Sequence, residues 1–406
     1  MKQDAIWIVG GGMLQVPAVE CAKKLGLKVI VSDRDVNCDC CNLADTFACI
    51  DIYDIENHIK NSEYPGIKDY NIKAIYTEGA DCEVTVAALA QHLSLRGSKP
   101  EAALKCKNKA MMREFLNRDL SPQWTEVSCS DLSSYDYADH FGYPVIVKPI
   151  DNCASKGLSV VTNPIYLNNA VKQAISYSTT RTCLIEEMLF GTEHTVEILI
   201  DPTLNFKWLP INICDRYFED YRTIGKIGYM TRIEKGHKNP SELDKKLQDK
   251  IYDIVYEASQ QIGIEFGVFK CDVILSEVEN MRHLKILECT NRLSGGFDSQ
   301  YTQPLAYGSD PIMASMMLAL GMNSYEDLIL NHTKKEHSAC LSIFTKDKVK
   351  MTPNVERIFT RKTFQDEIRN NSDRHTFVLT NAYTHSGCFK IEFESDKKIV
   401  EREKDA

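Results

Sequence analysis

Strand-like and helix-like segments alternate through the N-terminal quarter of the 406-residue chain, and this pattern restricts the fold more than any other feature. Apolar strands are expected at 5–12, 28–33 and 73–79, and helices at 15–26 and 82–95. Strands that alternate with helices form a parallel sheet whose faces the helices cover. The N-terminal region is therefore predicted to be a Rossmann-like unit.

The following segments predict two α+β subdomains and a short β-rich region. A strand at 143–150, a helix at 164–178 and a strand at 182–189 that carries two acids indicate the first subdomain. Beyond Gly191, apolar strands around a long helix at 242–263 indicate an antiparallel sheet with a helix on one face. Short strands and a charged tail follow from about residue 334.

The composition restricts the partners and the location of the protein. The net charge of -9 and the isoelectric point near 5.7 argue against nucleic acid as a partner, although a local basic cleft can hold a phosphorylated small molecule. No apolar run approaches the roughly 20 residues of a membrane helix, and the N-terminus has no signal-peptide pattern. We therefore expect a cytoplasmic protein without a membrane partner, whose 15 cysteines are reduced.

The glycines after the first strand raise the alternative of dinucleotide binding. Gly10 and Gly12 have the spacing of that fingerprint, and Asp33 lies about 20 residues on, where a ribose-binding acid would stand. Gln15 holds the third position, where the fingerprint has Gly or Ala. We prefer a tight strand-to-helix turn, and nicotinamide or flavin binding remains the alternative.

Two acids lie on apolar strands on either side of the polar stretch "SEVENMRH". Asp272 and Glu288 are equidistant from residue 280, so a hairpin that turns there places them opposite each other. Opposed residues have Cβ atoms about 4.5 to 5.5 Å apart, and two like charges at that distance repel unless a cation lies between them. Magnesium would relieve the repulsion, because it binds carboxylate oxygens together with phosphates. A different register would leave two unrelated surface acids.

Charged residues on other strands and helices add to this pattern. Lys148 follows the buried-looking "PVIV", so its ammonium group is expected to project from a rigid strand into a cleft. Lys109, taken alone, fits a solvated charge on a helix. Glu186 and Glu187 end an apolar stretch whose backbone groups can bind an adenine edge, and the Glu193 carboxylate can accept from ribose hydroxyls.

In series, these motifs resemble the ATP-grasp superfamily. The resemblance runs from about residue 5 to 320 and is carried by "TEGADCEVTVAALAQHLSLRGSKPEAALKCKNKAMMREFL", "PVIVKPIDNCASKG", "LIEEMLFGTEHTVE" and "GVFKCDVIL" with "LKILECTNRLSGG". Within the superfamily, the chain is most similar to the carboxylate-amine ligases related to the carbamoyl phosphate synthetase large subunit and to the L-amino-acid ligases.

The resemblance implies an α/β and α+β architecture with the ATP-grasp fold. It divides the chain into a Rossmann-like pre-ATP-grasp domain at 1–115, a small lid subdomain at 116–190, a catalytic subdomain with an antiparallel sheet at 191–330, and a short β-rich region at 331–406.

The resemblance also implies which residues bind ATP. Two lysines and the loop at 151–157 would contact the phosphates, the segment 186–189 would bind adenine through backbone groups, and one acid would hold the ribose. The residues at these positions are Lys109, Lys148, Ser155, Lys156, Gly157, Glu186, Glu187, Leu189 and Glu193.

The remaining matches concern metal and catalysis. Asp272 and Glu288 match the metal-binding carboxylates, and Arg292 matches the arginine beside the reacting carboxylate. The family pattern is Glu-x-Asn-x-Arg, whereas here Thr290 holds the Asn position and the amide is displaced to Asn291, which we take as a further metal ligand. The phosphate loop has one glycine where several are common.

The implied activity is that of an ATP- and Mg²⁺-dependent ligase, with Mn²⁺ as an alternative metal, which joins a small-molecule carboxylate to an amine through an acyl phosphate and releases ADP and phosphate. Alternatives on the same fold are a carboxylase or phosphotransferase and a noncatalytic nucleotide-binding subunit. Arg216 and the stretch 215–232 are expected to form part of the acceptor pocket, although Arg216 could equally make a structural ion pair. A homodimer is the default assembly.

Overall fold

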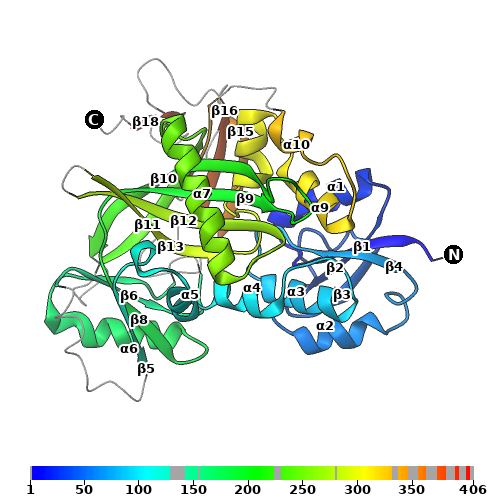
Figure 1. Cartoon of the computed structure of the whole chain (residues 1–406), viewed down its shortest axis with the longest axis horizontal. Coiled ribbons are helices and arrows are strands. Elements are labelled where there is room, and N and C mark those ends of the chain that lie inside the picture. Colours follow the sequence, from blue (N-terminus) through cyan, green and yellow to red (C-terminus); the bar gives the residue numbers. More distant parts are fainter. Residues whose placement is uncertain are drawn as a thin grey trace.

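The computed structural model consists of an N-terminal domain, a smaller lid and a central sheet to which the C-terminal strands are joined (Figure 1). The structure describes residues 2–128, 142–153, 156–223, 230–278, 281–331, 337–345, 355–362, 373–380, 389–392 and 399–402. In these ranges the strands form a four-stranded, a twelve-stranded and a two-stranded sheet. Within the same ranges, no helix is both long and apolar enough to cross a membrane.

The N-terminal domain has the predicted Rossmann-like arrangement. Its four parallel strands lie in the order β3-β2-β1-β4, and β1 reads as a continuous apolar run because both faces of the sheet are covered. The strand β3 and the helix α2 were not predicted from the sequence. The elements are β1 (Asp4–Val9), α1 (Val16–Lys24), β2 (Lys28–Asp33), β3 (Thr46–Cys49), α2 (Ile55–Ser62), β4 (Asn71–Tyr76) and α3 (Glu83–His92).

The glycine-rich segment after β1 is closed by the protein itself. Asp33 accepts a hydrogen bond from the Gly11 amide at 2.8 Å, and a Cβ on Gly11 would lie 2.3 Å from the Cys38 sulfur. The Gln15 side chain bonds to Thr77 and to the backbone amide of Glu78. These contacts support the tight-turn interpretation over dinucleotide binding, because the acid and the loop are already used.

The lid is the antiparallel end of the twelve-stranded sheet, covered by one helix. Its strands lie in the order β7-β6-β8-β5, and α6 buries Leu167, Val171 and Ala174 against them. This is the small α+β subdomain expected from the sequence. The elements are β5 (Trp124–Ser128), β6 (Val145–Pro149), β7 (Ser159–Val161), α6 (Leu167–Tyr177) and β8 (Thr182–Glu187).

The central sheet is antiparallel, in the order β13-β12-β9-β10-β11, and α7 lies across one face (Figure 1). The helix α7 begins after Asp244, whose carboxylate caps the amide of Leu247, and ends at Gly263, whose φ of 93° favours glycine. Both the sheet and the helix were predicted. The elements are β9 (Thr192–Ile200), β10 (Trp208–Thr223), β11 (Met230–Asn239), α7 (Lys245–Ile262), β12 (Gly267–Val278) and β13 (Met281–Thr290).

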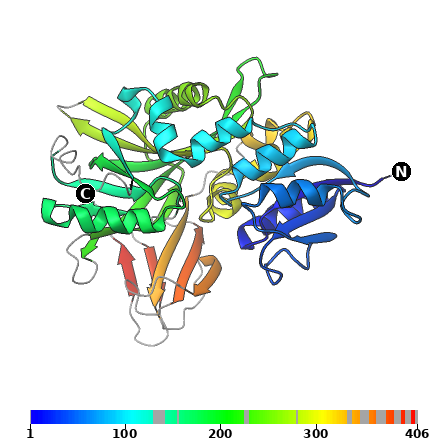
Figure 2. The same cartoon turned by 90° about the horizontal axis from the view of Figure 1, so that it is seen from below.

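Short helices and further strands join these parts. The helices α4 (Pro100–Lys107) and α5 (Lys109–Phe115) lead from the N-terminal domain to the lid, and α8 (Gln303–Tyr307), α9 (Pro311–Leu320) and α10 (Asp327–Leu330) follow β13. The predicted C-terminal β-rich region pairs with β11 through β14 (Figure 2). Its strands are β14 (Ser338–Thr345), β15 (Val355–Lys362), β16 (Asp373–Thr380), β17 (Phe389–Glu392) and β18 (Ile399–Arg402).

Gly191, between the lid and β9, should tolerate no side chain. A Cβ there would lie 2.0 Å from the backbone oxygen of Leu275 on β12. We expect Gly191→Ala to reduce the free energy of unfolding by about 1–3 kcal/mol, because backbone atoms would have to move. Gly12→Ala is the control, since no atom lies within 4 Å of a Cβ there. Equal urea denaturation midpoints for the two variants would contradict this view of the junction.

Candidate active site

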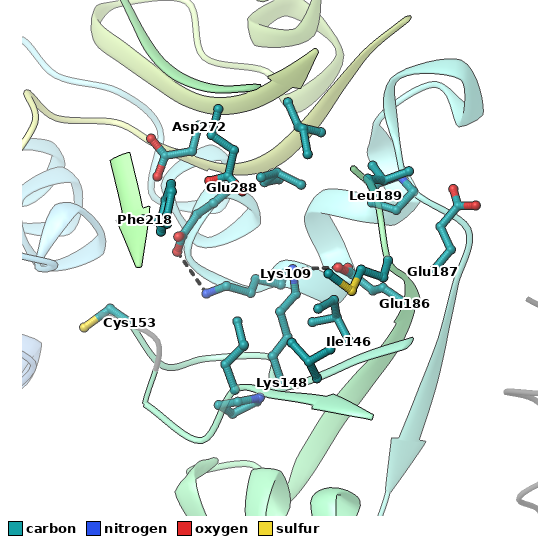
Figure 3. A pocket seen from close by; sticks show the side chains of 18 of the residues that line it. Lys109, Ile146, Lys148, Cys153, Glu186, Glu187, Leu189, Phe218, Asp272 and Glu288 are labelled. Atoms are coloured by element: carbon teal, nitrogen blue, oxygen red, sulfur yellow. Dashed lines mark ion pairs between the residues drawn. The ribbon is translucent and has the colours of Figure 1, made fainter. Parts of the chain in front are cut away.

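A cavity of ≈160 Å³ lies between the lid and the central sheet (Figure 3). It brings together residues that are more than 170 positions apart in the sequence, from Lys109 to Glu288. Ten of the predicted site residues line it, namely Lys109, Lys148, Lys156, Glu186, Glu187, Leu189, Glu193, Arg216, Asp272 and Glu288.

Asp272 and Glu288 face each other across β12 and β13, as predicted. The hairpin pairs Val278 with Met281, which in an unbroken register would set Asp272 opposite Leu287. The register shifts by one residue at Leu287, so β13 carries a bulge there and Glu288 becomes the partner of Asp272. The turn residues 279 and 280 lie outside the described residues.

Cations compensate the two opposed carboxylates. Asp272 accepts from Arg216 at 2.9 Å, from Lys270 at 2.8 Å and from the Thr195 hydroxyl at 2.7 Å. Burial alone would raise the pKa of Asp272, but Arg216 and Lys270 hold it well below its usual range. Glu288 pairs with the Lys109 ammonium at 2.9 Å, shown by a dashed line in Figure 3. Both acids are therefore ionised at neutral pH.

Asp272 and Glu288 could provide part of the oxygen ligands of a small divalent cation, and a bound ligand would provide others. Two ionised carboxylates face one cavity, and the buried hydroxyl oxygen of Thr290, two residues beyond Glu288 on β13, has no hydrogen-bond partner. Among the described residues, no group of three or more His, Cys, Asp or Glu side chains could hold a metal. These residues fit magnesium, which usually takes one or two carboxylates together with substrate phosphates.

Glu186 is the centre of a buried charge network. Its carboxylate contacts the Lys148 ammonium at 2.7 Å and the Arg113 guanidinium at 2.9 Å. Burial would raise the pKa of Glu186, yet the two cations lower it to about 2. The segment 186–189 was predicted to bind adenine. Within it, the Glu186 side chain holds Lys148 in place, and Leu189 lines the cavity.

Arg113 was not singled out from the sequence, although it lies four residues after Lys109 and hence on the same side of α5. Its guanidinium donates to the backbone oxygens of Ile286 and Leu287 at 2.8 and 2.9 Å, beside the bulge that orients Glu288. The side chain is fully buried. Arg113 thus ties the lid, through Glu186, to the strand that carries Glu288.

The other predicted nucleotide contacts lie around the same cavity. Lys109 donates to the Asn152 backbone oxygen at 2.7 Å and so reaches the predicted phosphate loop. The amide and the carboxylate of Glu187 both bond to the Gln123 backbone. Glu193 is buried and lies 3.7 Å from Arg216. Gly157 does not line the cavity; it has a φ of 76° and lies near Tyr177. Ser155 lies outside the described residues.

Arg216 makes the structural ion pairs that were the alternative to an acceptor role. In addition to Asp272, it binds both oxygens of Glu234 at 3.2 and 2.9 Å. It also lines the cavity, so its guanidinium still faces any ligand there. Residues 224–229 of the predicted acceptor stretch lie outside the described residues.

Asn291 and Arg292 lie apart from the carboxylate pair. The Asn291 amide donates to the Val268 backbone oxygen at 2.6 Å, which directs it away from Asp272 and Glu288. Arg292 forms an ion pair with Asp81 and donates to the Leu293 backbone oxygen at 2.8 Å. Both residues line a second cavity instead. Thr290, not Asn291, is the side chain after Glu288 that shares its strand face.

Part of the sequence matches a known family, and several known enzymes have similar sequences. The family model "D-ala D-ala ligase C-terminus" matches residues 121–290. Carnosine synthase 1 of Gallus gallus is 24% identical over 79% of this chain, which spans only 35% of that protein. The formate-dependent phosphoribosylglycinamide formyltransferase of Prochlorococcus marinus is 29% identical over 70% of this chain and 71% of its own length.

Solved structures have the same fold. The L-amino acid ligase from Bacillus licheniformis superposes with a TM-score of 0.71 at 16% identity, and the match covers 94% of each chain. Other structural neighbours were solved as complexes with ADP or with magnesium ADP. The ATP-grasp fold that was predicted from the motif series is confirmed.

Arg113 should be needed for the stability of the lid junction. We expect Arg113→Met to lower the free energy of unfolding by about 3–5 kcal/mol, because it leaves Glu186 without one of its two buried cations and frees two backbone oxygens. Arg118→Met removes an exposed arginine from the same region and should cost less than about 0.5 kcal/mol. Chemical denaturation of both proteins tests this, and similar losses would count against the assignment.

The same network predicts acid sensitivity. Because the folded pKa of Glu186 is about 2 and its ordinary value is 4.5, its stabilisation is complete above pH 4.5 and is lost as the pH falls toward 2. The loss amounts to about 3 kcal/mol. Glu186→Gln should be less stable at pH 7 but should lose less stability between pH 5 and 3. The exposed control Glu101→Gln should keep the parental slope; the same slope in Glu186→Gln would refute the prediction.

Proposed function

We propose that this chain, whose sequence and fold are similar to those of ATP-grasp ligases, is a ligase that uses ATP and magnesium to join a carboxylate to an amine. The reaction would pass through an acyl phosphate and release ADP and phosphate. The observation that carries this proposal is the opposed pair Asp272 and Glu288, facing Lys109 and Lys148 across one cavity under the lid. A nucleotide bound there would have cations and carboxylates on either side of its phosphates.

The ion pairs of the protein suggest how the site accepts ATP. Lys109 and Glu288 neutralise each other at 2.9 Å, and both would gain new partners when phosphates and a cation enter together. Lys148 stays tied to Glu186, so it would meet the phosphates as a fixed point charge. Magnesium, held by Asp272 and Glu288 with Thr290 alongside, would withdraw charge from the phosphate oxygens when bound. Mn²⁺, which prefers the same oxygen ligands, would serve as a substitute.

The remaining residues would position the reactants. Phosphoryl transfer depends mainly on alignment and on electrostatic stabilisation, and a closed lid supplies both by excluding water. Arg292 is proposed to neutralise the substrate carboxylate and then the oxyanion of the tetrahedral intermediate. Its ion pair with Asp81 would hold the guanidinium ready for this role, since Asp81 also lies against Cys153 of the phosphate loop. Glu193 would bind the ribose.

A measurement of ADP release can test this proposal and identify the carboxylate and the amine. ADP release from MgATP should be measured with a pooled panel of small carboxylates, each with and without added amines. Release that requires both partners would identify a ligase, whereas release that needs only bicarbonate or a lone phosphate acceptor would identify a carboxylase or phosphotransferase. ATP binding without release in any pool would favour a noncatalytic subunit. Size measurements in solution test the expected homodimer.

Glu288 should be needed for turnover but not for folding. We expect Glu288→Gln to lower ADP release on the order of 10²-fold or more, because it removes half of the carboxylate pair. Its melting temperature should stay near that of the parent, since this side chain is about one-third exposed at the cavity. Glu114→Gln, on the exposed face of α5, should leave the rate unchanged. EDTA should abolish release and Mg²⁺ or Mn²⁺ should restore it; full activity in Glu288→Gln would exclude the metal assignment.

A further inference from the structure

The predicted phosphate loop, residues 151–157, contains a single glycine. Glycines let a loop adopt many backbone conformations, so a loop with only one of them depends more on how its two ends are held. The described residues include both ends, at 151–153 and at 156–157. The contacts of these ends therefore bear on where the loop lies.

Asp151 holds the first end of the loop against the turn that follows α6. One oxygen of its carboxylate, Oδ2, accepts from the backbone amides of Thr179 and Thr180 at 3.0 and 3.1 Å. The same oxygen accepts from both threonine hydroxyls, that of Thr180 at 3.3 Å. Burial would raise the pKa of Asp151, but hydrogen bonds from this turn hold it below its ordinary value. The group is therefore ionised at neutral pH, and its hydrogen bonds are charge-assisted.

The turn that receives Asp151 is held by its own hydrogen bonds. The Ser178 hydroxyl bonds to that of Thr180 at 3.1 Å and accepts from the Thr182 amide at 3.2 Å. Arg181 has a φ of 58°, in the left-handed region that non-glycine residues seldom adopt. The strand β8 begins at Thr182 and leads to Glu186. Asp151 is thus bound to a part of the lid whose geometry is already fixed.

The second end of the loop rests on the same part of the lid. Gly157 has a φ of 76°, and a Cβ there would lie 2.8 Å from the Cβ of Tyr177, the last residue of α6. The Asn152 amide also reaches this residue, donating to the Tyr177 backbone oxygen at 2.8 Å. Both ends of the loop therefore contact the end of α6 or the turn after it.

Lys109 holds the loop from the side of the cavity. Its backbone amide donates to the Ile150 oxygen at 2.8 Å, and its ammonium group donates to the Asn152 backbone oxygen at 2.7 Å. The ammonium group also pairs with Glu288, and in the proposed function it gains phosphate partners when ATP enters. The contacts of Asp151 lie on the lid side, so they persist when Lys109 turns to the phosphates.

We propose that Asp151 is a positioning residue for the terminal phosphate of ATP. Neither Asp151 nor its partners Thr179 and Thr180 line the cavity, so Asp151 would act through the loop that it holds. Cys153 and Lys156, from the two ends of the loop, do line the cavity. The inference rests on the proposed function, because it requires ATP in this cavity.

The test is nucleotide binding by the full chain, measured by isothermal titration. Asp151→Ala should raise the dissociation constant for MgATP about tenfold or more, because it removes charge-assisted hydrogen bonds that hold the loop. Its affinity for AMP should stay that of the parent, since AMP lacks the terminal phosphates. Asp151→Asn keeps an acceptor oxygen and should give an intermediate value. Asn163→Ala removes the hydrogen bond to the Ile165 amide before the other end of α6, and should bind both nucleotides as the parent does.

A second variant guards against misfolding of Asp151→Ala. Thr179→Val removes one hydroxyl donor to Asp151 but keeps the backbone amide and the shape of an exposed side chain. It should weaken MgATP binding by about threefold, while its circular dichroism and its affinity for AMP remain those of the parent.

The results distinguish this inference from the proposed function. A parent chain that does not bind MgATP would overturn both. A parent that binds MgATP, with unchanged affinity in folded Asp151→Ala and Thr179→Val proteins, would overturn the positioning role alone. Equal losses of affinity for MgATP and for AMP would also overturn it, because they would indicate damage to the whole lid.

Discussion

Two carboxylates on adjacent strands repel each other, and the organisation of the candidate site follows from the need to offset that repulsion. Asp272 and Glu288 are directly opposed because β13 bulges at Leu287. Each is buried or partly buried in a place where an isolated charge would be costly. The fold therefore surrounds them with Arg216, Lys270 and Lys109, which come from three other positions in the sequence. These cations also face the cavity in which a polyphosphate would lie.

The lid is subject to the same electrostatic constraint. Lys148 is buried on β6, and burial lowers its pKa, so it needs Glu186 to remain charged. Glu186 in turn binds Arg113, whose other nitrogens bond to the backbone of β13. One chain of contacts thus extends from the lid lysine to the bulge beside Glu288. The positions of the lid and of Glu288 are linked by this chain, because neither end can shift without breaking a buried hydrogen bond.

The sequence predicted the parts of the site that depend on local pattern. The opposition of Asp272 and Glu288 follows from two strands of alternating side chains around a polar turn. The position of Lys148 in the cleft follows from its place at the end of an apolar run. The bulge at Leu287 could not be predicted, because a hairpin centred on residue 280 pairs Asp272 with Glu288 without any bulge. Arg113 was missed since a lone helical arginine gives no sign that both its partners come from distant strands. The orientations of the Asn291 and Arg216 side chains are set by a backbone oxygen and by acids close to them, whose positions cannot be predicted from spacing in the sequence.

The alternation of side chains along β12 and β13 also separates the charged face at the cavity from the packed core. Cys271 and Cys289 are neighbours of the two acids in sequence, but they point to the opposite face and pack in the core beneath α7. Burial raises the pKa of Cys271 well above its ordinary value, so that face remains neutral and apolar. Each strand thus carries charge toward the cavity and apolar surface toward the helix. Changing an acid on the cavity face leaves the packed face intact, because the two sets of side chains share a backbone but no contacts across it.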